Sequence, residues 1–431
     1  MIRLDADDAG FAQAFADLVD ARREADADVA RDVAAIVARV RGEGDAALRD
    51  LTRRFDRFDL DAHGWKLDRA DCLAAWEGLE PGLRDALELA AERIAAYHAK
   101  QKPEDRDEID AAGIRLGARW RAVDAAGVYV PGGRAAYPSS VLMNALPARA
   151  AGVGRLVMVT PTPDGEVNPL VLAAAHLAGV DEIWRIGGAQ AIAALAHGTE
   201  RIAPVDVITG PGNAWVAEAK RQLYGVVGID MVAGPSEIVV VADGRNDADW
   251  IAADLLSQAE HDPTSQSILF TDDAGFADQV AAAVERALAR LATEATARAS
   301  WDANGAIIVV PDLASAMPLV DRLAPEHLEL ACDQAEGLFD MVRHAGSVFI
   351  GRYTPEAVGD YVAGPNHVLP TGRRARFASG LSVLDFMKRT SFLGLDETAL
   401  AELGPATVAL AQAEGLPAHA RSVALRLRLN R

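Results

Sequence analysis

The feature that most constrains this fold is an alternation, from Val123 onward, of short apolar runs and helical stretches. Each run is only long enough for a strand, and most of the runs end at glycine or proline, which stop strands and form tight turns. Repetition of strand, glycine turn and helix predicts parallel strands joined by helical crossovers. The runs predicted as strands are Gly127–Val130, Arg155–Thr160, Glu182–Ile186, Asp206–Thr209, Ile238–Ala242, Ser267–Thr271 and Ala306–Val310.

Helical stretches lie between these runs and also occupy most of the first 100 residues. There, apolar positions recur at helical spacing through Val29–Arg41 and Leu83–Tyr97. The tail beyond Gly380 is predicted to be mainly helical. We therefore predict two α/β units with parallel-rich sheets. The helices predicted between the strands are Pro169–Ala178, Ala191–His197, Ala248–Glu260 and Phe276–Thr293.

Composition narrows the function classes. The net charge of -20 repels the phosphate backbone of nucleic acids. Backbone N–H groups at a helix start can still bind the phosphates of a small cofactor. The two cysteines, Cys72 and Cys332, cannot build a disulfide framework or a cysteine zinc site, and they favour a reducing compartment. Because no secretory segment or membrane-length apolar run is present, we expect a cytoplasmic protein with no membrane partner.

Two histidine-containing segments combine groups that suit catalysis, although each alone has an ordinary structural explanation. Gln258 and His261 are three residues apart near a predicted helix end, so they can converge on a metal; alternatively, His261 only complements the helix dipole. Glu326 and His327 can form a pair of bases whose pKa values shift on burial; alternatively, Pro325 begins a helix there.

Three further segments leave both interpretations open. Asp360 and the Gly364–His367 turn can supply a hard metal ligand, but a plain surface loop is the simpler interpretation. His419 follows Glu414 near the chain end, where a histidine is usually only solvated. The Thr209–Asn213 turn can face a phosphate, but it lacks the third glycine of the dinucleotide fingerprint.

A cysteine nucleophile, as aldehyde dehydrogenases use, would be a competing mechanism. Cys332 lies in the apolar run Leu328–Cys332, with no adjacent cation to lower its pKa. A small buried hydrophobic residue is the better interpretation.

Taken in their joint order, the motifs from about Gly127 to the C-terminus resemble the histidinol dehydrogenase family. The helical first third matches that family only in general character. One small departure is Trp215, where a tyrosine is common. The matching segments are Tyr129-Val130-Pro131-Gly132-Gly133, Gly187-Gly188-Ala189-Gln190-Ala191-Ile192, Gly210-Pro211-Gly212-Asn213, Gly228-Ile229-Asp230-Met231-Val232-Ala233-Gly234-Pro235-Ser236-Glu237, Gln258-Ala259-Glu260-His261-Asp262-Pro263, Pro325-Glu326-His327-Leu328-Glu329, Gly359-Asp360-Tyr361, Gly364-Pro365-Asn366-His367 and Glu414-Gly415-Leu416-Pro417-Ala418-His419.

The resemblance implies a zinc-dependent NAD oxidoreductase that converts L-histidinol to L-histidine through histidinaldehyde by two successive hydride transfers, the last steps of histidine biosynthesis. It implies the catalytic bases Glu326 and His327. The zinc ligands that it implies, for one ion per subunit, are Gln258, His261, Asp360 and His419. The substrate contacts that it implies are Ser236, Gln258, His261, His327, Asp360, Glu414 and His419, with His367 as a further neighbour. The NAD contacts that it implies are Tyr129, Gln190 and Asn213.

The resemblance also implies two incomplete Rossmann-like units with helical N- and C-terminal extensions, in a homodimer with shared active sites. The expected limits are 1–22 for the N-terminal extension, 23–128 with 237–379 for the first unit, 129–236 for the second, NAD-side unit, and 380–431 for the C-terminal extension that reaches the partner. Three alternatives stay open: a zinc hydrolase, a non-catalytic zinc-stabilised binding protein, and a dehydrogenase of other amino alcohols or polyols.

Overall fold

The computed structural model describes residues 1–21, 27–132, 137–232 and 234–428. Residue 23, where the first unit is expected to begin, lies outside the described residues, as do Gly133 and Ala233 of two quoted motifs. The chain divides into two compact units. Unit 1 comprises Met1–Gln101 and Val123–Phe386, and unit 2 comprises Lys102–Ala122 and Met387–Arg431.

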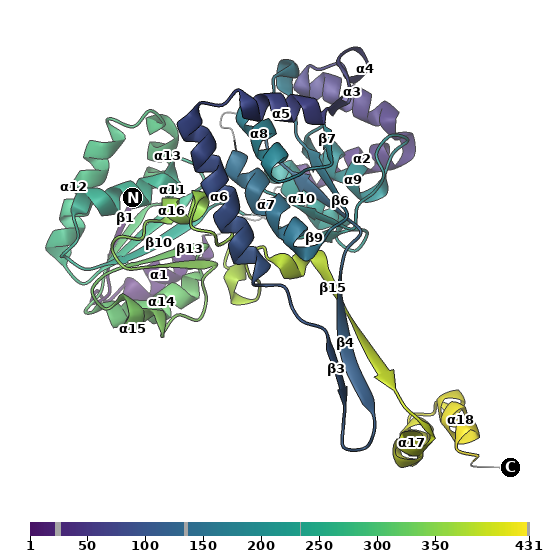
Figure 1. Cartoon of the computed structure of the whole chain (residues 1–431). Coiled ribbons are helices and arrows are strands. Elements are labelled where there is room, and N and C mark those ends of the chain that lie inside the picture. The colour runs from purple at the N-terminus through teal and green to yellow at the C-terminus, as the bar shows by residue number, and fades with distance from the viewer. Residues whose placement is uncertain (22–26, 133–136, 233, 429–431) are drawn as a thin grey trace. The chain divides into compact units, whose positions relative to one another are not determined.

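Unit 1 contains two six-stranded sheets in which every pair of neighbours is parallel except the β2–β7 pair (Figure 1). The predicted α/β class with parallel-rich sheets is therefore confirmed. The first sheet has the order β1 (Ile2–Asp5), β12 (Ala306–Val309), β11 (Gln266–Thr271), β10 (Glu237–Ala242), β13 (His327–Ala331), β14 (Ser347–Ile350). The second has the order β2 (Lys66–Leu67), β7 (Glu182–Trp184), β6 (Arg155–Val159), β5 (Ala125–Tyr129), β8 (Val207–Thr209), β9 (Gly228–Ile229).

Both sheets share one strand order. Apart from the edge strands β1 and β2, five successive strands lie side by side in the order third, second, first, fourth, fifth. The order reverses between β10 and β13 in the first sheet and between β5 and β8 in the second. In open α/β sheets, such a switch point is where ligands bind, in the crevice outside the carboxyl ends of the strands.

Helices cover both faces of each sheet. As a result, the central strands β10 and β5 are buried along their whole length. Helices α11, α12 and α13 lie on one face of the first sheet, and α1, α14 and α15 lie on the other (Figure 1). Apolar side chains of each group pack against the sheet. One face of the second sheet packs against α2, α3, α9 and α10, and α7 packs against β5.

The helices of unit 1 agree in most places with the sequence prediction. Their bounds are α1 (Phe11–Asp20), α2 (Ala27–Glu43), α3 (Asp45–Asp56), α4 (Leu60–His63), α5 (Arg69–Glu77), α6 (Pro81–Ala99), α7 (Pro138–Ala151), α8 (Pro169–Leu177), α9 (Gly188–His197), α10 (Ala214–Leu223), α11 (Ala248–Ala259), α12 (Ala274–Leu288), α13 (Glu294–Asn304), α14 (Leu313–Leu323), α15 (Ala335–Phe339) and α16 (Glu356–Tyr361), with short 3-10 turns at Pro163–Gly165, Arg374–Arg376 and Val383–Phe386.

Three local features were not predicted from the sequence. Pro325 does not begin a helix, because His327–Ala331 pairs with strands on both sides. The tail beyond Gly380 is mainly helical, as predicted, but the strand Met387–Gly394 precedes its two helices. The N-terminal residues 2–5 form the edge strand β1. The expected domain limits stay a prediction.

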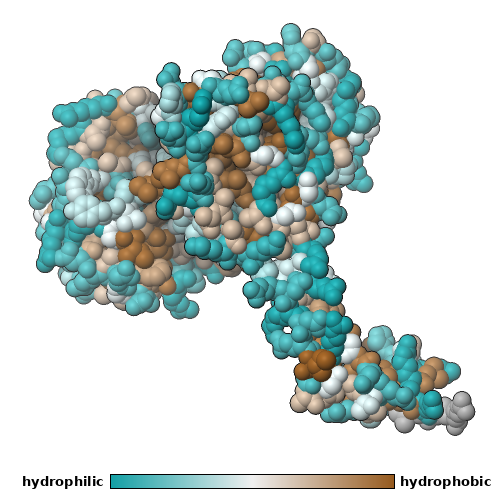
Figure 2. Space-filling model, viewed as in Figure 1, coloured by the Kyte–Doolittle hydropathy of each residue, from teal (hydrophilic) through white to brown (hydrophobic). Residues whose placement is uncertain are grey.

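Unit 2 is a three-stranded antiparallel sheet followed by two helices. The strand order is β15 (Met387–Gly394), β4 (Arg115–Ala122), β3 (Arg106–Ile109), and the helices are α17 (Glu397–Ala413) and α18 (Pro417–Arg426). Large apolar side chains are exposed on this unit, where Figure 2 shows brown atoms; among them are Ile109, Leu393, Leu410 and Leu425. None of the helices in the described ranges has both the length and the apolar character that a membrane span requires.

Candidate active site

The two predicted bases lie at the amino edge of the first sheet, where the central strands β10 and β13 begin. His327 is the register partner of Ile238, so Glu326 stands beside Glu237. The Glu237 backbone N–H donates to Glu326 Oε2 at 3.0 Å, and His327 Nδ1 is 3.2 Å from the Glu237 carbonyl oxygen. Strand pairing therefore fixes both groups on one edge, and both are buried.

Gln258 and His261 reach the same edge from α11. This helix is the crossover between the parallel strands β10 and β11, so its C-terminal end returns to the side where the strands begin. Gln258 Nε2 is 3.3 Å from His261 Nδ1, which confirms that the spacing brings the two side chains together. Gln258 is fully buried, and its Oε1 has no hydrogen-bond partner among the described residues. A buried oxygen without a hydrogen-bond partner costs free energy, and an oxygen whose lone pairs are free can bind a metal ion.

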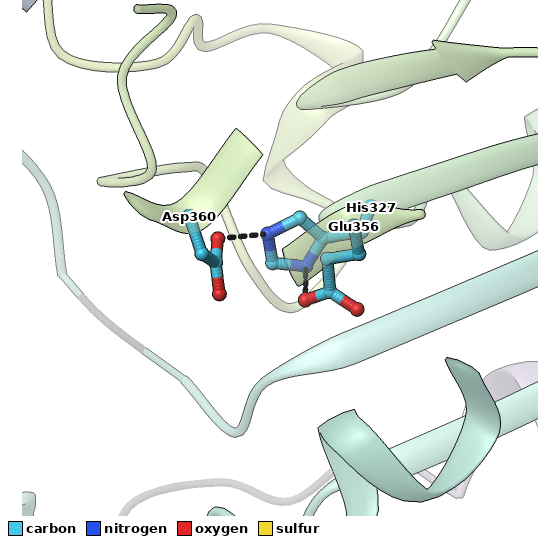
Figure 3. A group of neighbouring side chains, drawn as sticks. All are labelled: His327, Glu356 and Asp360. Atoms are coloured by element: carbon cyan, nitrogen blue, oxygen red, sulfur yellow. Dashed lines mark ion pairs between the residues drawn. The ribbon is translucent and has the colours of Figure 1, made fainter. Parts of the chain in front are cut away.

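The short helix α16 supplies two carboxylates that stand on either side of the His327 ring (Figure 3). Glu356 Oε1 is 3.1 Å from Nδ1, and Asp360 Oδ1 is 3.7 Å from Nε2. The three groups lie close enough to hold a metal ion. However, each carboxylate faces a different ring nitrogen, so the ring separates the carboxylates, an arrangement that suits orienting the imidazole better than chelation.

Sequence reasoning missed Glu356, which is buried beside the predicted base. The signal was present, because Glu356 and Asp360 are four residues apart and so share one face of a helix. Asp360 was interpreted as a loop residue in the simpler alternative, and no helix was predicted around it.

Burial shifts the ionisation of these groups in ways that suit proton transfer. It raises the pKa of Glu326 well above its ordinary value, and it lowers the pKa of His327 to about 3. Burial also raises the pKa of Asp360 to about 7. The pKa of Glu356 is raised well above its ordinary value by burial and then by the neighbouring Asp360 carboxylate. His327 is therefore a neutral base at neutral pH, and Glu326 holds a proton more readily than an exposed carboxyl group.

Two further predicted contacts adjoin this cluster. His367 Nδ1 is 3.1 Å from the carbonyl oxygen of Asp360, and burial lowers the pKa of His367 to about 4. Ser236 directly precedes β10, and its carbonyl oxygen accepts the Gln266 N–H at 3.0 Å. The structure therefore brings most of the predicted site residues of unit 1 to one sheet edge.

The predicted NAD contacts lie at the carboxyl edge of the second sheet, where its central strands end. Tyr129 ends β5, and its Oη accepts the Gly188 N–H at 3.1 Å where α9 begins. Gln190 is buried in the first turn of that helix. Asn213 caps α10 after β8, with Oδ1 accepting the Val216 N–H at 3.1 Å. Tyr129 and Asn213 therefore flank the switch point between β5 and β8.

Close backbone approach at this edge explains its glycines. A Cβ on Gly210 would lie 2.1 Å from the Tyr129 carbonyl oxygen, and the φ of Gly210 is +115°. A Cβ on Gly132 would lie 2.5 Å from the Pro161 carbonyl oxygen. Glycine-lined turns and two helix starts fit a pyrophosphate group, which binds backbone N–H groups at short range.

The remaining predicted contacts belong to unit 2. Glu414 is the C-cap residue of α17, and His419 lies in the first turn of α18; both are exposed within this unit. Their participation in the site stays a prediction. Cys332 lies at the other end of β13 from the predicted bases, and burial raises the pKa of its thiol, so a thiolate nucleophile is disfavoured.

Comparison with known proteins decides the family. The model of the family described as histidinol dehydrogenase matches residues 19–427. Histidinol dehydrogenase from Zymomonas mobilis is 64% identical over 99% of both chains, and that from Rhodospirillum rubrum is 61% identical over 99% of this chain and 98% of the relative. The chain belongs to the histidinol dehydrogenase family. A crystal structure of histidinol dehydrogenase from Elizabethkingia anophelis has a TM-score of 0.94, with 34% identity over 99% of this chain and 98% of the other.

Histidinol dehydrogenases are NAD-dependent oxidoreductases that catalyse the last steps of histidine biosynthesis. The predicted resemblance is therefore confirmed. The family match covers unit 2 as well as unit 1, and it extends into the helical first third, which carried no motif.

Proposed function

We propose that this chain oxidises L-histidinol to L-histidine through histidinaldehyde, reducing two NAD molecules at one zinc-containing site. The observation that supports this most directly is the cluster at the amino edge of the first sheet. It combines a neutral imidazole, a carboxyl group of raised pKa and a pair of potential metal ligands within hydrogen-bonding range.

The zinc ligands in this proposal are Gln258, His261 and Asp360 of one subunit, with His419 supplied by a second copy of the chain. Two imidazoles, an amide oxygen and a carboxylate suit zinc, and the unpartnered Oε1 of Gln258 fits the role. The bound ion would supply a fixed point for the substrate's nitrogen atoms and electrostatic stabilisation of the reacting oxygen.

His327 is the base for the alcohol step in this proposal. Its Nε2 has no hydrogen-bond partner in the described part of the chain, and its Nδ1 faces the Glu237 carbonyl and Glu356. Nε2 is therefore the nitrogen free to take the hydroxyl proton as hydride leaves. Glu326 activates water for attack on the aldehyde, which gives the hydrate that undergoes the second oxidation.

The carboxyl edge of the second sheet binds NAD in this proposal. Tyr129, Gln190 and Asn213 contact the cofactor, while backbone N–H groups at the start of α9 and α10 face its phosphates.

A single assay tests the proposal: NADH formation with L-histidinol, with and without a zinc chelator, counting NADH per histidinol consumed. We expect about two NADH per substrate, loss of turnover on chelation and recovery with added zinc. Failure to form NADH from histidinol would contradict the oxidoreductase assignment, and full activity of metal-free protein would contradict the zinc assignment.

We also propose a homodimer in which Glu414 and His419 complete the partner's site. The exposed apolar side chains of unit 2 support a second subunit, since such surface usually marks an interface. Glu326→Gln and His419→Asn should each be nearly inactive. Mixing them during co-expression should restore about a quarter of wild-type activity if assortment is random and pairing two-fold. No recovery in confirmed hybrid dimers would rule out the shared site.

A further inference from the structure

A buried ion pair lies beneath the glycine turn that follows β8. Lys220 of α10 pairs with Asp230, the residue after β9, and the two side chains are only 2% and 1% exposed. Burying an ion pair costs desolvation free energy that mutual attraction seldom recovers in full, so such a pair is weak evidence for stability alone. Its contacts point to another role.

Both charged groups bind the backbone of one residue, Gly210. The Lys220 ammonium donates to the Gly210 carbonyl oxygen at 3.0 Å, and Asp230 Oδ2 accepts the Gly210 N–H at 2.9 Å. The ion pair therefore binds both backbone polar groups of this residue and orients them toward the protein interior. Charge-assisted hydrogen bonds of this kind are the strong ones.

Gly210 is consequently held between two rigid groups. On one side is the ion pair, and on the other the Tyr129 backbone lies so close that an added Cβ would be 2.1 Å from its carbonyl oxygen. The turn that follows, through Asn213 to the exposed start of α10, inherits its direction from this clamped residue. Lys220 thus holds the turn that directly precedes its own helix, α10.

The same carboxylate also fixes the start of a second loop. Asp230 Oδ1 accepts the Met231 N–H at 2.6 Å, and the Asp230 N–H donates to the Ile208 carbonyl of β8 at 3.2 Å. Further along the chain, the Gly234 N–H donates to Thr371 Oγ1 at 2.6 Å, two residues before Ser236. The Asp230 carboxylate therefore binds both the Gly210–Asn213 turn and Met231, from which the chain leads to the predicted substrate contact Ser236.

We propose that Lys220 and Asp230 are positioning residues for the dinucleotide: their ion pair holds the Gly210–Asn213 turn in the conformation that binds NAD and sets the start of the Met231–Ser236 loop. This inference rests on the proposed function, since it requires NAD to bind at the carboxyl edge of the second sheet. Neither residue touches the cofactor; both act through the Gly210 peptide.

The test compares NAD affinity with stability in four variants. Lys220→Met and Asp230→Asn each leave one buried charge without its partner, and Lys220→Met/Asp230→Asn removes both charges while an amide oxygen can still accept the Gly210 N–H. The matched control is Asp243→Asn at the carboxyl edge of the first sheet. Asp243 forms two contacts with Arg352, at 3.0 and 3.1 Å, and both side chains are 17% exposed.

The readouts are the Kd for NAD by calorimetric titration of the zinc-loaded, full-length protein, its melting temperature and its zinc content. We expect the Kd to rise about tenfold or more in both single variants, as loss of a charge-assisted hydrogen bond would give, with unchanged zinc content. The double variant should recover melting temperature but keep the weak affinity. Asp243→Asn should lose stability and keep wild-type affinity.

If NAD affinity instead follows melting temperature across all four variants, or stays at the wild-type value in the double variant, the positioning role is refuted. If a single variant does not fold, the double variant and the control still decide the question. Failure of the proposed function gives a different result, because wild-type protein would then bind no NAD.

Discussion

The two sheets of unit 1 share one strand order but present their functional groups at opposite ends. In the first sheet, Glu326 and His327 stand at the amino edge of the central strands. In the second, Tyr129 and the Gly210 turn stand at the carboxyl edge. Both clusters flank the switch point of their sheet. Topology therefore fixes which strands border a site, and the side chains decide which end of the strands is used.

The carboxyl edge of the first sheet differs in chemistry from that of the second sheet. Arg352 binds both oxygens of Asp243 there and also pairs with Asp333. Asp243, which directly follows β10, also accepts the backbone N–H groups of Arg245 and Asp333. These interactions satisfy the polar groups among themselves. The corresponding edge of the second sheet instead carries glycines and helix starts, whose N–H groups suit an incoming phosphate.

The largest effects are expected at the amino edge of the first sheet. His327→Asn and Glu326→Gln should each lower kcat about a thousandfold, within the range for loss of a positioned acid–base group, without a comparable rise in the Kd for NAD. Glu326→Gln should slow histidinaldehyde oxidation more than histidinol oxidation, because only the second step consumes water. Single-turnover measurements with each substrate check this division, and equal losses in both steps would contradict it.

Loss of the buried amide ligand should come next. Gln258→Leu keeps the side-chain volume but removes the unpartnered Oε1, so zinc affinity should fall about ten- to a hundredfold and turnover should recover in part at high zinc. Titration with a competing chelator measures this affinity. A variant that keeps wild-type zinc affinity would show that the oxygen is not a ligand. The Kd for NAD serves as the control and should not change.

A smaller effect is expected from adding a methyl group at Gly210, in the turn proposed to bind NAD. Gly210→Ala should raise KM for NAD about tenfold or more, because the added Cβ meets the Tyr129 carbonyl and φ is positive. The matched control is Gly351→Ala after β14 in the first sheet, where φ is +93° but the Cβ would meet no atom within 4 Å. Gly351→Ala should cost only the strain of the backbone conformation. Equal effects of the two substitutions on KM for NAD would contradict a special role of the Gly210 turn in binding NAD.

The smallest effect on turnover is expected from Asp56, at the end of α3. Burial raises its pKa to about 6, above the ordinary 3.8, so the folded state favours the neutral carboxyl. The stability from this group is therefore complete below pH 4 and lost as the pH rises through 6. Asp56→Asn should gain about 1.4 kcal/mol relative to wild type between pH 5 and pH 7.5. Chemical denaturation at the two pH values measures the difference; a pH-independent difference would contradict the burial effect.

Sequence reasoning predicted seven of the parallel strands because each is a short apolar run, and most of these runs end at glycine or proline, as Arg155–Val159 does before Pro161. It did not predict β9, β13 or β14. It missed β1, because Ile2–Asp5 carries only two apolar residues and depends on pairing with β12. It missed β15 for a similar reason: Met387–Gly394 mixes charged and apolar residues, and its pairing partner is more than 260 residues away in sequence. Long-range pairing leaves no local signal.

The candidate site divides in the same way. The convergence of Gln258 and His261 followed from helical spacing, which is local. The placement of Glu326 beside Glu237 depends on the register of β10 against β13, which no local pattern contains. For this reason the motifs could name candidate residues, whereas the edge of the sheet at which these residues lie became apparent only in three dimensions.

Unit 2 is assembled from two chain segments, Lys102–Ala122 and Met387–Arg431, and this has a consequence for synthesis on the ribosome. The β3–β4 hairpin emerges early, but the strand that pairs with β4 along eight register positions is among the last to be translated. Through most of translation, one edge of β4 is therefore open to pairing with another nascent chain. Charged side chains are the usual protection for such an edge, and Arg115, Arg119 and Arg121 supply them along β4.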